Sequence, residues 1–290
     1  MKYLVLFITS LLLSFTSVYS VEEDEGIGEI ISRYFSNEKN TNIPIVDFSY
    51  GPEKLSFSSG FNSVFEGNYA SEIQYGYIRY DKEIAKLGYI YFSSERAFLG
   101  STSSRFKPTP VDDLTIKTDI YRYGGLYNNG FGYGTEEGSK FLFSHSSAIV
   151  WTESDVENFA FNSSDNELLA EFEDENNFGM FYTSGVNYTF GNGVTSLEVK
   201  YRHNVVWTDF QFGGWIGSWA VENVLQRAPD LFHETMIKEF GGFYPLMYHA
   251  YKTLVSYYIY EKRGESTYWP FDGSKVLNFR SVVLGVKFPL

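Results

Sequence analysis

The stretch "TSLEVKYRHNVVW", residues 195–207, alternates between apolar and polar side chains. A period of two predicts a β-strand, because successive side chains of a strand point to opposite faces. One face carries Leu197, Val199, Tyr201, His203, Val205 and Trp207, and the other carries Ser196, Glu198, Lys200, Arg202, Asn204 and Val206. In a soluble sheet the apolar face would be buried, whereas in a membrane barrel it would meet lipid and the charged face would line the lumen.

Similar alternation recurs through most of the chain from about residue 45. A hairpin is predicted at Gly191-Asn192-Gly193, and another around Gly51-Pro52. The predicted strands reach about ten residues, which is longer than the usual five or six of soluble sheets and is enough for a tilted strand to cross a bilayer. Several second faces hold Gly, Ser, Thr, Asn and scattered charges, a mixture that suits a narrow polar lumen.

One region departs from this alternation. Residues 213–240 have helical spacing with a break near Pro229, and the following "YPLMYHAYKTLVSYYIYEKR" fits either a helix or a long strand. A helical insertion is therefore predicted near residues 213–262. Three placements are open: along the membrane interface with Trp215 and Trp219 as anchors, inside the lumen as a plug, or as a helical pair on one end of the sheet.

The N-terminus has the features of an export signal. Lys2 precedes an apolar run from Leu4 to Phe15, and Val18-Tyr19-Ser20 forms a small-residue cleavage site before an acidic segment. Residues 1–20 are predicted to be a signal peptide, residues 21–44 a lead-in segment, and residues 45–290 the β-barrel domain. The alternative for the first segment is a single anchoring helix, although its apolar run is short for a full span.

Composition narrows the function classes. Aromatic residues make up 19% of the chain, with 24 Tyr beside 27 Phe, and such tyrosine use suits surfaces that are apolar at one end and wet at the other. The net charge of -13 argues against a nucleic-acid partner, and the absence of cysteine excludes disulfides and thiolate metal sites. "FEDENNFG" lacks the ligand spacing of a calcium loop, so no metal and no cofactor are expected.

The chain ends "NFRSVVLGVKFPL", with apolar residues on one parity up to the last position. This resembles the closing strand of bacterial outer-membrane β-barrels, in which a glycine is followed at fixed spacing by two apolar or aromatic residues. Gly285, Phe288 and Leu290 match that closing-strand signal, while Leu284 stands where a polar residue is usual and Pro289 is atypical. The resemblance implies the bacterial outer membrane as location, outer-membrane lipid and lipopolysaccharide as surroundings, and the barrel assembly machinery as a partner.

Together these features predict an all-β fold, an antiparallel transmembrane β-barrel of about 8–12 strands with the helical insertion near residues 213–262. Five charged residues are predicted to line its lumen: Glu198, Lys200, Arg202, Lys117 and Asp119. With so few strands the lumen would be filled by side chains or hold a small ligand, which disfavours a general diffusion pore.

The expected function is structural, binding or small-ligand transport, without evident catalysis. One enzymatic alternative involves His145 and Ser147, which share a strand face in "FSHSSAI". This pair is similar to the His-x-Ser pair of outer-membrane lipid A deacylases. The resemblance implies that Ser147 would be the nucleophile of this chain and His145 its general base. The Asn-Gly that continues that motif is missing and no acid can be assigned. A secreted soluble β-sheet binding protein is the other alternative.

Overall fold

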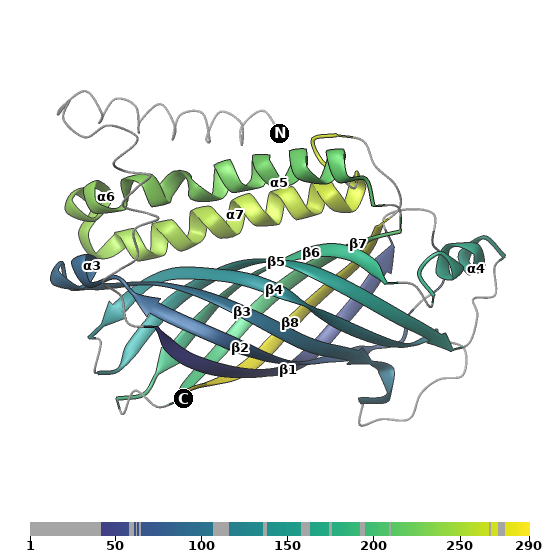
Figure 1. Ribbon diagram of the computed structural model, residues 1–290, viewed down its shortest axis with the longest axis horizontal. Coiled ribbons are helices and arrows are strands. Elements are labelled where there is room, and N and C mark those ends of the chain that lie inside the picture. The colour runs from purple at the N-terminus through teal and green to yellow at the C-terminus, as the bar shows by residue number, and fades with distance from the viewer. Residues whose placement is uncertain are drawn as a thin grey trace. The chain divides into compact units, whose positions relative to one another are not determined.

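The computed structural model describes residues 42–57, 61, 63, 65–106, 116–135, 138–157, 163–173, 176–191, 195–208, 210–266, 268–271 and 276–290. These residues form a closed antiparallel barrel in which neighbouring strands follow chain order (Figure 1). The strands are β1 (Ile43–Phe57), β2 (Asn68–Tyr80), β3 (Tyr89–Ser103), β4 (Lys117–Gly134), β5 (Lys140–Glu157), β6 (Asn177–Thr189), β7 (Ser196–Trp207) and β8 (Val276–Pro289). The predicted antiparallel barrel is confirmed, at the lower limit of the expected strand number.

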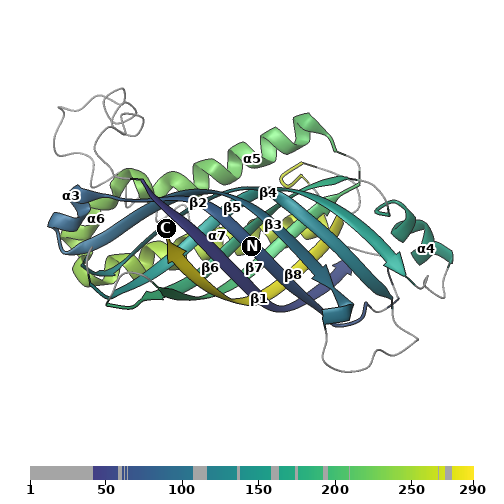
Figure 2. The same ribbon diagram turned by 60° about the horizontal axis from the view of Figure 1, so that its bottom comes forward.

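The ring closes between the first and last strands. β8 pairs antiparallel with β1 from Ile45 opposite Pro289 to Phe57 opposite Leu277, and Figure 2 shows the two strands side by side. Closure leaves no strand with an unpaired edge, which removes the exposed backbone groups that would be costly in lipid.

The predicted hairpin around Gly51-Pro52 is wrong, because both residues lie within the continuous strand β1. Proline lacks the N–H that a ladder needs, so it normally ends or interrupts pairing. Here the pairing of β1 with β2 continues through Pro52 opposite Tyr69. Pairing with β8 stops at Tyr50 and resumes at Glu53 in the same register, so the proline interrupts one ladder without turning the chain.

The predicted helical insertion is confirmed and lies between β7 and β8. It consists of α5 (Phe212–Arg227), η2 (Ala228–Phe232), α6 (His233–Phe240), η3 (Gly241–Phe243) and α7 (Tyr244–Glu265). We call this segment, from Phe212 to Glu265, the lateral hairpin, because α5 and α7 run side by side along the outside of the barrel (Figure 1). The interpretation as a lumen plug is therefore wrong.

Helix α7 joins the hairpin to the wall along the length of the barrel. Near its start, Tyr244 and Tyr248 pack with Phe131 of β4. Near its end, Ile259 packs with Trp207, the last residue of β7. Within the described residues, no helix combines the length and the overall apolar character of a membrane-crossing segment.

Elsewhere in the described part of the chain there are three short helical elements. They are α3 (Lys82–Lys86) after β2, η1 (Ser104–Phe106) after β3, and α4 (Ser163–Ala170) between β5 and β6. The predicted signal peptide, residues 1–20, lies outside the described residues, as does the predicted lead-in apart from residues 42–44. Of these, Ile43 and Pro44 already belong to β1.

Candidate functional site

The lumen of the barrel is occupied by paired charges. The Asp47 carboxylate on β1 accepts hydrogen bonds from Arg96 at 3.1 Å and from the Lys200 ammonium at 3.0 Å. Lys200 also lies 3.1 Å from Glu198, and Lys287 lies 3.5 Å from the same carboxylate. All five side chains are buried, and we call them the lumen cluster: Asp47, Arg96, Glu198, Lys200 and Lys287.

Two further ion pairs lie in the lumen beside this cluster. Arg202 donates to Glu72 at 2.6 Å, and Arg122 donates to Glu53 at 3.0 Å. Buried charges are costly unless they are paired, and removing one partner leaves the other charge uncompensated. The arrangement therefore pairs charges within the interior and fills it with side chains, as expected for an eight-stranded ring.

Three of the five predicted lumen charges lie in the lumen. Glu198, Lys200 and Arg202 are on the inward parity of β7. Lys117 and Asp119 are not in the lumen, which corrects that part of the prediction. They share the outward parity of β4 with the exposed Tyr121, and Asp119 pairs with the exposed Arg105 at 3.1 Å. Both residues lie near the start of β4, where charges on the outer face remain close to water.

The signal for the missed lumen residues was present in the sequence. Asp47 and Glu53 share a parity on β1, but the predicted turn at Gly51-Pro52 placed them on separate strands. Glu72 shares a face with Gln74 on β2, and Arg96 shares a face with Phe98 on β3. The alternation along one strand shows which of its residues share a face. It does not show which charges meet, because the lumen cluster forms only when the closed ring brings β1, β3, β7 and β8 together.

His145 and Ser147 share the outward face of β5, as the sequence predicts, but α7 covers the histidine. His145 Nε2 hydrogen-bonds Ser256 Oγ of α7 at 2.9 Å. The same hydroxyl accepts a hydrogen bond from Gln226 of α5 at 2.5 Å. His145 thus connects the barrel wall to the hairpin, and this geometry gives no support to its acting as the base for Ser147.

The side of the hairpin that faces inward carries charged and polar side chains among its apolar ones. Arg263 of α7 donates to Glu222 of α5 at 2.6 Å. Lys252 lies 3.0 Å from Asp230 and donates at 3.2 Å to Asn129 on the outer face of β4. These side chains are buried, so the ion pairs hold the two helices to each other and to the wall.

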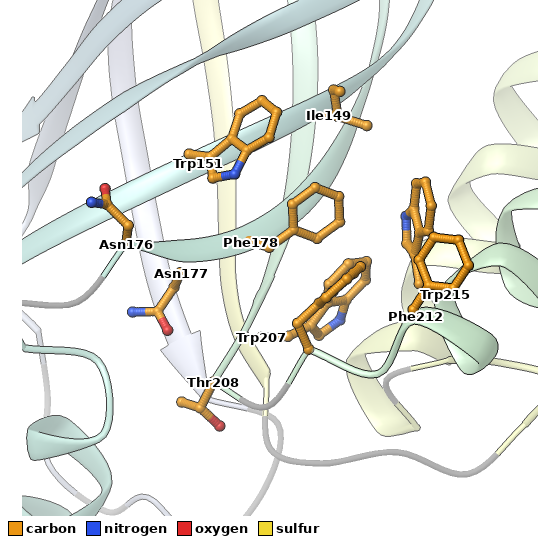
Figure 3. Close-up of a pocket in the computed structure, with 10 residues that line it drawn as sticks. Ile149, Trp151, Asn176, Asn177, Phe178, Trp207, Thr208, Phe212 and Trp215 are labelled. Atoms are coloured by element: carbon orange, nitrogen blue, oxygen red, sulfur yellow. The ribbon is translucent and has the colours of Figure 1, made fainter.

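An aromatic groove lies where α5 begins, beside β5, the start of β6 and the end of β7 (Figure 3). Its volume is about 510 Å³. Phe178 lies at its centre, 5.5 Å from both Trp207 and Trp215 between ring centroids. The residues that line it are Ile149, Trp151, Asn176, Asn177, Phe178, Trp207, Thr208, Phe210, Phe212 and Trp215.

The polar residues of the groove are grouped. Asn176, Asn177 and Thr208 lie on the side away from Phe212 and Trp215 (Figure 3). Among the described residues, the lining contains neutral amides and a hydroxyl but no charged side chain. Such a site is suited to an apolar body with a neutral hydrogen-bonding end. This groove could not be predicted from the sequence, since it depends on how α5 packs beside the strands of the wall.

No protein-family model matches the chain, and no curated protein sequence matches it. Among solved structures, the chain is similar to a crystal structure of Neisserial surface protein A, with a TM-score of 0.36 and 11% identity over 85% of this chain and 97% of that chain. It is also similar to Ail, the attachment invasion locus protein of Yersinia pestis, with a TM-score of 0.27 and 8% identity over 85% of this chain and 99% of that chain. The closed eight-stranded fold rests on the strand pairing of this chain itself.

Proposed function

We propose that this protein is a non-conducting β-barrel of the bacterial outer membrane that acts through its outer wall, in a structural or binding role. The observation that carries the proposal is the distribution of polarity. The wall exposes large apolar side chains, while the charged side chains of the lumen cluster are buried. A soluble barrel would have the opposite arrangement.

The exposed apolar side chains are spread around the ring. Leu99 on β3 is 64% exposed and Leu284 on β8 is 66% exposed. Soluble monomers rarely expose continuous apolar surface beyond a few hundred Å². Such a wall is suited to contact with lipid. The exposed residues on the outward faces of the strands include Phe48, Tyr50, Ile73, Tyr75, Tyr77, Leu99, Tyr121, Tyr123, Tyr127, Phe141, Tyr188, Leu197, Val199, Val282, Leu284 and Phe288.

Outer-membrane lipid and lipopolysaccharide are the proposed surroundings, and the barrel assembly machinery is the proposed assembly partner. The placement of the C-terminal residues is consistent with the latter. Phe288 and Leu290 lie on the outward parity of the closing strand, and Gly285 faces inward between Asp47 and Glu198. A side chain at Gly285 would crowd the lumen cluster, with its Cβ 3.2 Å from an Asp47 oxygen.

The test is cellular fractionation after expression in a Gram-negative host. The mature chain is expected in the outer-membrane fraction, and folded protein is expected to change its gel mobility on heating, because closed barrels resist unfolding by detergent. A water-soluble monomer, purified without detergent, would refute the membrane proposal and favour a secreted barrel.

A second candidate function is binding of a neutral amphiphile in the aromatic groove, for which the grouped polar end is the supporting observation. Phe212 lines the groove and is exposed, and Phe243 at the other end of the hairpin is also exposed but lies outside it. In detergent, Phe212→Ala should weaken the binding of a fluorescent monoacylglycerol, and Phe243→Ala should leave it unchanged. Equal effects of the two variants would contradict a specific site.

A further inference from the structure

We propose that the outer face of the lateral hairpin lies in the same hydrocarbon layer as the barrel wall and contacts the acyl chains of the bilayer. This inference rests on the proposed membrane location of the barrel. It adds a second lipid-facing surface, built from helices, to a protein whose strands already supply one.

The polarity of the hairpin is the reverse of that of a helix pair in water. Val224 of α5 is 73% exposed and Leu254 of α7 is 55% exposed. Within two residues of each in the sequence, Glu222 and Lys252 are buried. An amphipathic helix on a soluble protein turns its apolar side inward and its charges outward. Here the charges point inward, so the exposed side fits an apolar solvent.

The length of the apolar surface also fits a bilayer. From Tyr244 to Tyr260, which is 17 residues of α7, the exposed side chains are Leu246, Met247, Ala250, Leu254 and Tyr257, and none is charged. At the helical rise of 1.5 Å per residue, this stretch is about 25 Å long, close to the height of the apolar band of outer-membrane barrels.

Exposed charges occur beyond the two ends of that stretch. Lys238 and Glu239 precede it on α6, and Glu265 follows it at the end of α7. On α5 the exposed side chains from Phe212 to Val224 are likewise uncharged, and Arg227 is the exposed charge that ends the helix. Charged residues at both margins and uncharged residues between them are the pattern expected for an element at membrane depth.

The buried ion pairs explain how such helices tolerate charges. A helix that crosses lipid alone must be apolar all round, whereas α7 turns one side to the barrel. On that side, Lys252 meets Asp230 and Asn129, and Arg263 meets Glu222. Each of these ionic groups is paired with a protein group, which is the condition for ionisable residues at membrane depth.

Lipid is favoured as the occupant because the exposed hairpin face continues the exposed wall. α7 packs over strands β4 to β8, and the outward faces of β1, β2 and β3 carry exposed apolar side chains of the same kind. A protein partner covering only the hairpin would leave that wall exposed. Lipid covers both surfaces at once, and a second copy of the chain is the competing occupant to be tested.

The absence of cysteine makes the experiment direct, since each introduced thiol is unique. Val224→Cys and Leu254→Cys test the hairpin, Leu99→Cys is the reference on the wall, and Glu265→Cys is the water-exposed control. Full-length variants are refolded into phosphatidylcholine vesicles, checked for heat-modifiable mobility, and reacted with a small polar maleimide. Reaction in denaturant gives the intrinsic reactivity of each thiol.

Val224→Cys and Leu254→Cys are expected to react about tenfold more slowly than Glu265→Cys, like Leu99→Cys, because hydrocarbon excludes the polar reagent and the thiolate. Fast labelling at both hairpin positions with Leu99→Cys still protected would overturn the inference alone. Fast labelling at Leu99→Cys as well would instead overturn the membrane proposal. Protection of the hairpin that disappears when the protein is diluted in excess lipid would identify a second copy as the occupant and also overturn the inference.

Discussion

Asp47→Asn should strongly destabilise the barrel, because Asp47 joins two cations in the lumen. The lumen cluster has two acids, Asp47 and Glu198, and three bases, Arg96, Lys200 and Lys287. Its formal charge is therefore one positive unit, and Asp47→Asn raises this to two. Lys200 keeps Glu198 at 3.1 Å, whereas among the described ion pairs Arg96 has no acid other than Asp47.

Removing one partner of a buried ion pair costs about 3–5 kcal/mol, and we expect Asp47→Asn to lie in this range. Lys287→Gln is the matched control, because it brings the cluster to neutrality and leaves Glu198 paired with Lys200. Its expected cost is about 1 kcal/mol, that of one ordinary polar interaction. Adding Arg96→Gln to Asp47→Asn should recover part of the loss, since it removes the cation that Asp47→Asn leaves without an acid.

The measurement is urea unfolding from lipid vesicles, followed by the fluorescence of the five tryptophans and by gel mobility. Equal destabilisation by Asp47→Asn and Lys287→Gln would show that charge balance does not govern the stability of the lumen. A double variant less stable than Asp47→Asn alone would lead to the same conclusion.

Three further predictions follow from the wall and the ring. Phe288→Asp should reduce assembly into the outer membrane, because a charge facing lipid costs about 1–4 kcal/mol. Lys287→Gln, on the opposite face of the strand, should still assemble. A pulse-chase experiment that follows the heat-dependent change in gel mobility compares the two variants. Gly76→Ala should destabilise the barrel by about 1–3 kcal/mol, because the added Cβ would lie 2.0 Å from the Glu95 carbonyl oxygen. Gly67→Ala is the control, because its added Cβ would have no atom within 4 Å. The midpoints of urea unfolding measure the difference in stability. Because side chains fill the lumen, the protein should form no open channels in planar bilayers, as measured by single-channel conductance. Stable conductance steps would contradict the closed lumen.

The strand faces were predictable from the sequence because parity is a local property. On β7 the charged residues Glu198, Lys200 and Arg202 alternate with apolar ones, and the structure has them on the inner face. The prediction for Lys117 and Asp119 was wrong, because two charges near the end of a strand do not distinguish the inner face of β4 from its outer face. The exposed Tyr121 on the same parity was the better indicator.

The hairpin was predictable as helical but not as part of the wall. Ser218, Glu222 and Gln226 recur every four residues and mark a polar face of α5, yet the spacing does not reveal that this face is buried. Burial depends on Lys252, Ser256 and Arg263 of α7, which meet that face only after the chain has turned back on itself. The aromatic groove depends on the same long-range packing.

The position of the lateral hairpin in the chain has a consequence for the order of folding. Strands β1 to β7 each pair with the strand that follows them in the chain. β8, in contrast, must pair with β7 across residues 208–275 and with β1 from the far end of the barrel domain. Long loops make such closure entropically slow. Docking of α7 on the seven-stranded sheet would shorten the search, since Val276 at the start of β8 packs in the same apolar cluster as Ile259 and Trp207. Such docking would guide the last strand to the open side of the seven-stranded sheet.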